Sequence, residues 1–144
     1  MVGGVDDTGL ALGSRYKTTM VPVWQISPIE ENSIAVMFNL HSEKNLQRAL
    51  DDTLYYKVPD LTAILQIVQE SDLRTSSILF SPVFNNFRKQ LVVGSISIVF
   101  SWDDVLNKLL PSYINGILCV IRTNIGQSYT FLVNGYDVRV IDKG

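Results

Sequence analysis

The chain contains little of the chemistry on which enzymes and metal sites depend. Among its 144 residues there is one cysteine, Cys119, and one histidine, His41. A single cysteine cannot form an internal disulfide, and a single histidine is too little for a Ser-His-Asp or Cys-His arrangement or a histidine-rich metal site. The glycines are scattered singly and form no phosphate-cradling loop. We therefore expect no enzymatic activity, no bound metal and no cofactor.

Basic residues and long apolar runs are also scarce. The formal net charge is −2, so no basic surface for a phosphate backbone is expected, and nucleic acid is not an expected partner. No run approaches the ~20 apolar residues of a membrane-spanning helix. Residues 1–13 lack a basic segment followed by an apolar one, and the chain has no Asn-x-Ser/Thr sequon. These absences favour a soluble protein, or a soluble piece of a larger one.

What the chain does contain indicates a folded core. Hydrophobic residues make up 47% of the sequence and charged residues 18%, so burial can offset the entropy lost on ordering. The length suits one domain. Residues 1–20 are rich in glycine, threonine and aspartate, and we expect them to be a disordered lead-in. We place the domain at residues 21–142.

The first part of this domain is predicted to be a strand hairpin followed by a helix. Residues 22–28, bracketed by two prolines, and residues 34–40, apolar almost throughout, are predicted strands that pair across a turn. Ser42 is the predicted N-cap of a helix that ends within residues 55–60. The apolar residues on one face of that helix are Leu46, Ala49, Leu50 and Leu54.

The middle of the chain is predicted to consist of strands. Residues 61–70 fit a helix by the spacing of their apolar residues and a strand by their Ile and Val content. We favour a strand because Pro59 and a turn at Ser71-Asp72 leave little room for a stable helix. Residues 77–84 and 91–100 are the next strands, and the longer one alternates apolar residues with serines, which predicts one core face. The predicted core-facing residues are Ile96, Ile98 and Phe100.

The last part is predicted to be a capped helix followed by strands. Ser101 is the predicted N-cap of a helix that Pro111 stops, with Asp104 in the capping-box position. The predicted strands cover residues 117–123, 129–133 and 136–141. Asn134-Gly135 is the predicted two-residue turn between the last two, because both central positions of such a turn need positive φ.

The order of these elements predicts the fold class. Tight hairpins imply antiparallel pairing, and few helices imply one covered face of the sheet. We therefore predict an α+β fold, with a PAS-like single antiparallel sheet of about five to seven strands and flanking helices.

Several segments carry a further pattern. They are FNLHSE at 38–43, RAL at 48–50, LT at 61–62, LQIVQE at 65–70, LFSPVF at 79–84, VG at 93–94 and FSWDDVL at 100–106. In this order and spacing they resemble the CHASE domains, which are extracytoplasmic sensor modules of receptor kinases and nucleotide cyclases. Two further segments, PVWQISP at 22–28 and GQSYTF at 126–131, look more narrowly like ectodomains of algal and diatom receptor-type adenylate or guanylate cyclases.

The resemblance implies a sensor domain on the extracytoplasmic side of the plasma membrane that binds a small-molecule ligand. It also implies that membrane-spanning helices, a catalytic cyclase or kinase domain, and helices that form a homodimer lie outside this chain. The long helix that precedes the sheet in the family is missing, so we expect the chain to be a fragment of a larger membrane receptor. The residues assigned to the ligand site are Phe38, Ser42, Leu65, Val68, Phe80 and Phe100.

The resemblance also bears on which ligand is expected. In the plant cytokinin receptors of this family, the key carboxylate falls at Ser42, the pocket threonine at Phe80 and a leucine at Val68. Here a hydroxyl replaces the carboxylate and a bulky ring replaces the threonine, and both changes oppose an adenine-type ligand. Cytokinin binding is therefore not expected, and the ligand is left open.

Most of these residues also fit simpler structural roles. Cys119 lies in an apolar run typical of a buried strand, and Ser42 fits a helix N-cap. Asp103 and Asp104 fit the first turn of a capped helix, and His41 fits the end of a strand. Two functions therefore remain open: a small-molecule sensor domain, and a non-ligand-binding structural or protein-interaction domain of similar fold.

Overall fold

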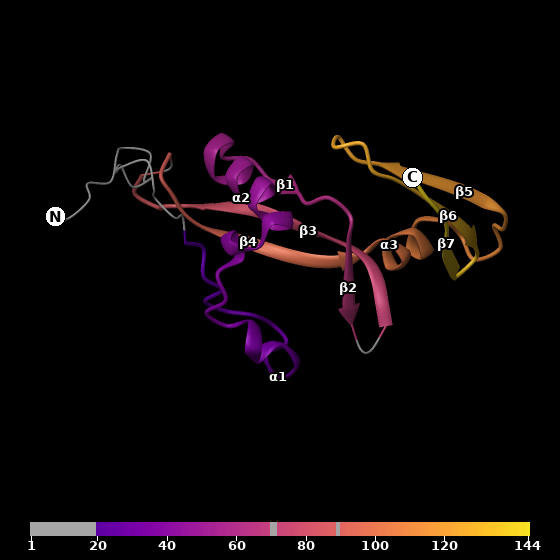
Figure 1. Ribbon diagram of the computed structural model, residues 1–144, viewed down its shortest axis with the longest axis horizontal. Helices are drawn as coiled ribbons and strands as arrows, with labels where there is room; N and C mark the ends of the chain where they lie inside the picture. The colour runs from indigo at the N-terminus through magenta and orange to yellow at the C-terminus, as the bar shows by residue number, and fades with distance from the viewer. Residues whose placement is uncertain (1–19, 70–71, 89) are drawn as a thin grey trace. The chain divides into compact units, whose positions relative to one another are not determined.

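The computed structural model describes residues 20–69, 72–88 and 90–144 (Figure 1). The predicted lead-in lies outside the described residues except for its last position. The chain divides into two units: one combines the chain up to Asp60 with Phe80–Ser97, and the other combines Leu61–Leu79 with Ile98–Gly144. The extent of the domain, 21–142, stays a prediction.

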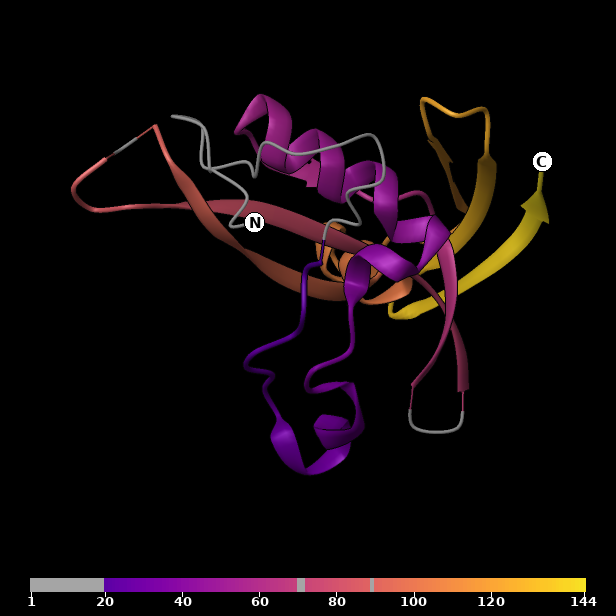
Figure 2. The same ribbon diagram turned by 60° about the vertical axis from the view of Figure 1, so that its left-hand side comes forward.

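In the first unit, residues 20–40 form a loop that projects from the rest of the unit, and the two ends of this loop, its legs, run side by side (Figure 2). Pro22 and Asn39 form an isolated antiparallel bridge between the legs. The short helix α1 (Ile29–Asn32) and the 3-10 helix η1 (Ser33–Ala35) lie between them in the chain. We call residues 20–40 the apolar lobe, because most of its large apolar side chains are exposed.

The two strands predicted in this segment, 22–28 and 34–40, are wrong. A proline lacks the N–H that a ladder needs, and Pro22 and Pro28 bracket the first of them. Pro28 also directly precedes α1, and the two glutamates in the first turn of α1 favour the start of a helix. The two segments are therefore not strands, but the isolated bridge and backbone hydrogen bonds between residues 21–23 and 37–40 do pair them across a turn, as predicted.

Helix α2 (Lys44–Tyr56) follows the 3-10 helix η2 (Leu40–Ser42). The predicted helix is confirmed, but Ser42 is not its N-cap, since Ser42 Oγ instead donates to the Asn39 carbonyl at 2.6 Å. The Asn39 side chain accepts from His41 N–H at 3.2 Å. Asn39 therefore caps η2, the separate turn that precedes α2. Three of the four predicted core residues of the helix are buried: Leu46, Ala49 and Leu50.

Strand β3 (Asp72–Phe84) pairs with three others: β1 (Asp60–Leu61), β2 (Leu65–Gln69) and β4 (Val92–Ser101). β2 and β3 are antiparallel, with Leu65 opposite Ser76 and Gln69 opposite Asp72. The strand interpretation of residues 61–70 is therefore confirmed for Leu65–Gln69, and the helix interpretation is wrong there.

The core face predicted for β4 is wrong. Ile96 is 61% exposed and Ile98 is 56% exposed. Of the three predicted core residues only Phe100 is half-buried, with its ring edge-on to Trp102 at a centroid distance of 5.2 Å. The alternation of side chains shows which residues share a face, but it does not show whether another layer covers that face.

The second unit contains a three-stranded antiparallel sheet in the order β5 (Ile117–Arg122), β6 (Ser128–Asn134) and β7 (Asp137–Lys143). Helix α3 (Trp102–Leu109) contributes Leu106 to a core shared with two fully buried residues of β6. Those two are Phe131 and Val133. Cys119, opposite Phe131 on β5, packs against this core but is only half-buried, whereas its apolar run is typical of a buried strand.

The hairpin turn of this sheet lies one residue later than predicted. Asn134 pairs with Asp137, so the two turn residues are Gly135 and Tyr136. Gly135 has φ of 58° at the first central position, where a turn of type II′ requires glycine. A Cβ at Gly135 would lie 2.6 Å from the Ser112 carbonyl oxygen, so the close approach of this loop also requires glycine.

The fold is α+β with antiparallel sheets and helices beside them, as predicted. The described strands fall into two hydrogen-bonded sheets, whereas one was expected. Across the described part of the chain, no helix combines the length and apolar character needed to cross a bilayer.

Candidate ligand-binding site

The six residues predicted to bind a ligand are divided between the two units. In the first unit, Phe38 lies in the apolar lobe and is 47% exposed, and Ser42 is exposed at the end of η2. Phe80, on β3, is fully buried. The Phe80 ring therefore fills the core, while the other two side chains face solvent.

In the second unit, Leu65 on β2 and Phe100 on β4 are half-buried. Val68 lies on β2 opposite Leu73, and its side chain is outside the described part of the structure. The partner of the Phe100 ring is Trp102, whose Nε1–H donates to Ser77 Oγ at 3.0 Å. The grouping of all six residues in one site stays a prediction.

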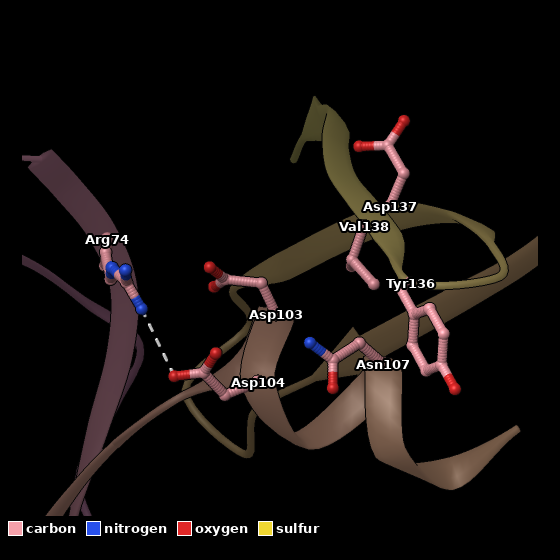
Figure 3. A pocket seen from close by; sticks show the side chains of 7 residues that line it. All are labelled: Arg74, Asp103, Asp104, Asn107, Tyr136, Asp137 and Val138. Carbon is pink, nitrogen blue, oxygen red and sulfur yellow. Dashed lines mark hydrogen bonds and ion pairs between the residues drawn. The ribbon is translucent and has the colours of Figure 1, made fainter. Parts of the chain in front are cut away.

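The second unit also contains an open pocket of about 440 Å³, which we call the polar pocket (Figure 3). It is lined by β3, α3 and the start of β7, through Arg74, Asp103, Asp104, Asn107, Tyr136, Asp137 and Val138. The carboxylates of Asp103 and Asp104 and the amide of Asn107 project to the side on which Arg74 lies, whereas the Asp137 carboxylate points away (Figure 3). None of these residues was predicted as a ligand contact.

Local sequence explains the α3 side of the polar pocket. Ser101 is the N-cap position of α3, as predicted, and both aspartates stand in its first turn, where the helix dipole favours negative charge. The cap differs from a capping box, since Ser101 Oγ donates to Asp104 Oδ2 at 2.6 Å. The same oxygen accepts from Arg74 Nη1 at 3.2 Å. Asp104 therefore ties α3 to β3 and is already engaged.

The β7 side of the polar pocket follows the Gly135-Tyr136 turn. Asp137 forms a two-point ion pair with Arg139, through Nη2 at 2.7 Å and Nε at 3.1 Å. The hydrogen bond from Asp137, together with its charge, raises the pKa of Arg139 above its usual value. Asp137 is thus engaged within its own strand, which agrees with the direction of its carboxylate.

Three polar groups of the pocket remain for a ligand: the Asp103 carboxylate, the Asn107 amide and the Tyr136 hydroxyl. Within the described residues, no hydrogen bond or ion pair of these three side chains is recorded. The described acidic, histidine and cysteine side chains form no group of three suited to a metal ion, so the three aspartates do not make a metal site. The arrangement suits a polar molecule that donates hydrogen bonds to a carboxylate.

Sequence reasoning missed this pocket for identifiable reasons. The first turn of a capped helix is a sufficient local reason for both Asp103 and Asp104, so the sequence does not show that only Asp104 has partners. Arg74 and Tyr136 gave no signal, since they lie far apart in the sequence and belong to no motif. Only the packing of α3 between β3 and β7 within the second unit places them together.

Comparison with protein families decides which family the chain belongs to. Its sequence matches the family model described as CHASE domain over residues 11–128, which is most of the chain. The chain belongs to the CHASE domain family. No curated protein and no solved structure matches the chain.

This match confirms the family predicted from the sequence. CHASE domains are sensory domains of receptors and are not catalytic. The match to the CHASE family ends at Ser128, the first residue of β6. Arg74, the α3 aspartates and Asn107 therefore lie inside the CHASE match, whereas Tyr136 and Asp137 lie beyond it. The polar pocket combines residues from both parts of the sequence.

Proposed function

We propose that this chain is the extracytoplasmic sensory domain of a transmembrane receptor of the cyclase or histidine kinase type, and that it binds a small molecule and relays a conformational signal. The observation that carries this proposal is the CHASE match over residues 11–128. The narrower likeness to algal and diatom cyclase ectodomains favours a cyclase as the effector. Membrane-spanning helices and the effector then belong to the parent receptor.

The ligand in this proposal is a small polar cation or polyol that occupies the polar pocket. Asp103 accepts hydrogen bonds from its ammonium or hydroxyl groups, and Asn107 and Tyr136 orient it. A ligand ammonium also competes with Arg74 for Asp104, which weakens the tie between β3 and α3. The shift of α3 relative to β3 is the signal in this proposal.

A thermal-shift measurement on the 144-residue chain tests this function. The probes are spermidine, glycine, glucose, citrate and adenine, which represent amines, amino acids, sugars, organic acids and nucleobases. A ligand present at ~100 times its Kd stabilises the folded chain by about 2.7 kcal/mol, which raises Tm by roughly 5–10 °C. We expect an amine probe to give this shift and citrate to give none.

Matched variants locate the site. In the polar pocket, Asp103→Asn abolishes the shift, while Asp142→Asn, an exposed aspartate elsewhere on β7, leaves it intact. A shift that survives Asp103→Asn and is lost in Phe38→Ala assigns the ligand to the residues predicted from sequence instead. If no probe of any class shifts Tm, ligand sensing is contradicted.

The alternative is a non-ligand-binding structural or protein-interaction domain of similar fold. One observation favours an interaction role: in the apolar lobe Trp24 is 88% exposed and Ile34 is 94% exposed. Large apolar side chains that are this exposed in one segment are compatible with a surface that another protein covers.

A further inference from the structure

The apolar lobe, residues 20–40, exposes large apolar side chains that the rest of the described chain does not cover. No residue of the lobe is buried. Trp24 is 88% exposed and Ile34 is 94% exposed. The other exposed apolar side chains of the lobe are Met20, Ile29, Met37 and Phe38. Single apolar residues on a surface need no explanation, but this density within one short loop is compatible with a surface that a partner covers.

Hydrogen bonds hold the base of the lobe in shape. Val23 N–H donates to the Phe38 carbonyl at 3.0 Å, and Met37 N–H donates to the Val23 carbonyl at 2.7 Å. The Asn39 side chain adds a further bond, accepting from Val21 N–H at 2.8 Å. The apolar side chains near the base therefore stand on a defined backbone, which reduces the entropy lost when a partner binds.

The lobe projects from its unit, with α1 at its far end (Figures 1 and 2). Beyond α1 the backbone again bonds to itself: Val36 N–H donates to the Ser33 carbonyl at 3.2 Å, and Phe38 N–H donates to the Ala35 carbonyl at 3.1 Å. An apolar medium penalises backbone groups that lack such partners. A bilayer also yields to a projecting loop, whereas a protein partner needs a groove that matches it. Shape and backbone bonding therefore favour a lipid surface.

Trp24 has the chemistry of a residue at a membrane interface. Across the described residues, no hydrogen bond of its indole N–H is recorded. By contrast, Trp102 Nε1–H donates to Ser77 Oγ at 3.0 Å. A large apolar ring with an unpaired N–H suits the boundary between acyl chains and headgroups, where tryptophan is enriched in membrane proteins.

The charge of the lobe selects the kind of lipid. Glu30 and Glu31 lie exposed on α1, and residues 18–43 include no lysine or arginine. Within the described residues, no ion pair is recorded for either glutamate. Anionic headgroups repel these carboxylates, whereas the phosphatidylcholine headgroup ends in an ammonium group that attracts them. The complementary surface is therefore zwitterionic.

We propose that the apolar lobe docks on a zwitterionic lipid surface. Trp24 and its apolar neighbours enter the boundary between headgroups and acyl chains, to a depth of about 5–10 Å. Glu30 and Glu31 stay among the headgroup ammonium groups and limit that depth. The contact holds the lobe, and with it the start of the described chain, at the bilayer.

This inference rests on the proposed function, because a domain on the extracytoplasmic side stands beside a membrane leaflet that lacks the anionic lipids of the cytoplasmic one. It does not require a ligand in the polar pocket, which belongs to the second unit. The change in Tm on ligand binding and the binding to lipid are therefore separate measurements, and either can fail without the other.

Co-sedimentation with vesicles tests the proposal on the 144-residue chain. We expect half of the chain to bind at about 0.1 mM phosphatidylcholine, which is the strength of a single acyl anchor. Binding to vesicles of equal parts phosphatidylcholine and phosphatidylserine is expected to be about 10-fold weaker. The double variant Glu30→Gln with Glu31→Gln should remove most of this difference while it changes binding to phosphatidylcholine less than about 3-fold.

Matched aromatic variants locate the contact. Trp24→Ala is expected to weaken binding to phosphatidylcholine at least about 10-fold, because the buried ring is lost. Phe87→Ala is the control, since Phe87 is 97% exposed in the β3–β4 turn of the same unit but lies outside the lobe. It should bind like the wild type. Both changes are at exposed positions, and an unchanged Tm checks that both variants fold.

Fluorescence measures the depth of the lobe in the bilayer. The chain has two tryptophans, so Trp102→Phe leaves Trp24 as the only one. We expect its emission to shift to the blue on phosphatidylcholine vesicles. Lipids brominated near the headgroup end of the acyl chain should quench it more than lipids brominated near the methyl end. Trp24→Phe leaves only Trp102 and is expected to show neither effect.

Several outcomes overturn the proposal. A wild-type chain that does not bind phosphatidylcholine vesicles at about 1 mM lipid has no such surface. Stronger binding to the vesicles that contain phosphatidylserine contradicts the role of the glutamates. Binding that survives Trp24→Ala and is lost in Phe87→Ala assigns lipid contact to another surface. Emission of Trp24 that shifts with a synthetic leucine-lysine helix, and not with vesicles, assigns the lobe to a protein partner.

Discussion

The side-chain amide of Gln127 hydrogen-bonds to both backbone groups of Ile64. Ile64 N–H donates to Gln127 Oε1 at 3.0 Å, and Gln127 Nε2 donates to the Ile64 carbonyl at 3.4 Å. Ile64 is buried and lies between β1 and β2, outside any ladder. One side chain from the loop before β6 thus satisfies two buried backbone groups of a segment distant in sequence.

We predict that Gln127→Ala lowers the free energy of unfolding by about 2 kcal/mol, because it leaves the buried Ile64 N–H and C=O without partners. Urea denaturation followed by circular dichroism measures the change. Gln127→Glu keeps the acceptor and loses the donor, so its effect is expected to be smaller. Gln90→Ala, in the exposed β3–β4 turn, is the neutral control. An unchanged stability in Gln127→Ala would contradict the structural role of this amide.

Two buried threonines are predicted to respond in opposite directions to the same change. Thr62 Oγ1 accepts from Ile78 N–H at 2.9 Å, so Thr62→Val leaves that buried N–H unpaired and costs about 1–3 kcal/mol. Thr53 Oγ1, on α2, is buried with no partner in the described structure. Thr53→Val therefore removes an unsatisfied hydroxyl and is expected to stabilise by roughly 1 kcal/mol. The same denaturation measurement on both variants gives the sign of each effect.

A third prediction concerns the end of α2. Lys57 caps that helix with φ of 59° and ψ of 34°, a left-handed conformation in which a Cβ crowds the backbone. Lys57→Gly is expected to raise the free energy of unfolding by about 0.5–1 kcal/mol, since glycine adopts this conformation without that crowding but loses more entropy on folding. Lys57→Ala keeps the Cβ and serves as the control for loss of charge. If the alanine variant gains as much as the glycine variant, the left-handed strain is not the cause.

The link between β3 and α3 gives a fourth prediction. Asp104 accepts from both Ser101 and Arg74, and the ion pair with Arg74 is half-exposed. Asp104→Ala is expected to lower the free energy of unfolding by about 1 kcal/mol. Asp104→Asn keeps an acceptor, so it is expected to lower the free energy of unfolding by about half as much. Raising the salt concentration screens the ion pair, so the difference in the free energy of unfolding between wild type and Asp104→Asn should become smaller. A larger loss for the asparagine variant would contradict this assignment.

The sequence predicted those elements whose local pattern and tertiary environment agree. The apolar spacing of Leu46, Ala49 and Leu50 predicted the buried face of α2, and Ser101 predicted the start of α3. Both signals are local, because a helix face and a cap depend on residues within one or two turns. The family could also be predicted, since the order of several short motifs survives even where each motif alone is weak.

Other features could not be predicted because they depend on what lies opposite a segment. The apolar run at 34–40 has the composition of a strand, but within the described residues it forms only an isolated bridge and a few backbone hydrogen bonds with residues 21–23, and part of it is the 3-10 helix η1. Ile96 and Ile98 alternate like core residues and are exposed. Ser42 has a side chain suited to an N-cap, yet its hydroxyl donates a hydrogen bond to the nearby Asn39 carbonyl instead.

By itself the sequence determined the α+β class, the CHASE family and the absence of paired cysteines and of histidine clusters, because composition and motif order need no contacts. Only the tertiary structure decided which carboxylates are free. In the second unit it sets Arg74 against Asp104 and leaves Asp103 in the polar pocket, and in the first it leaves Trp24 in water. These are differences in burial and partnership between chemically similar residues, and only packing distinguishes them.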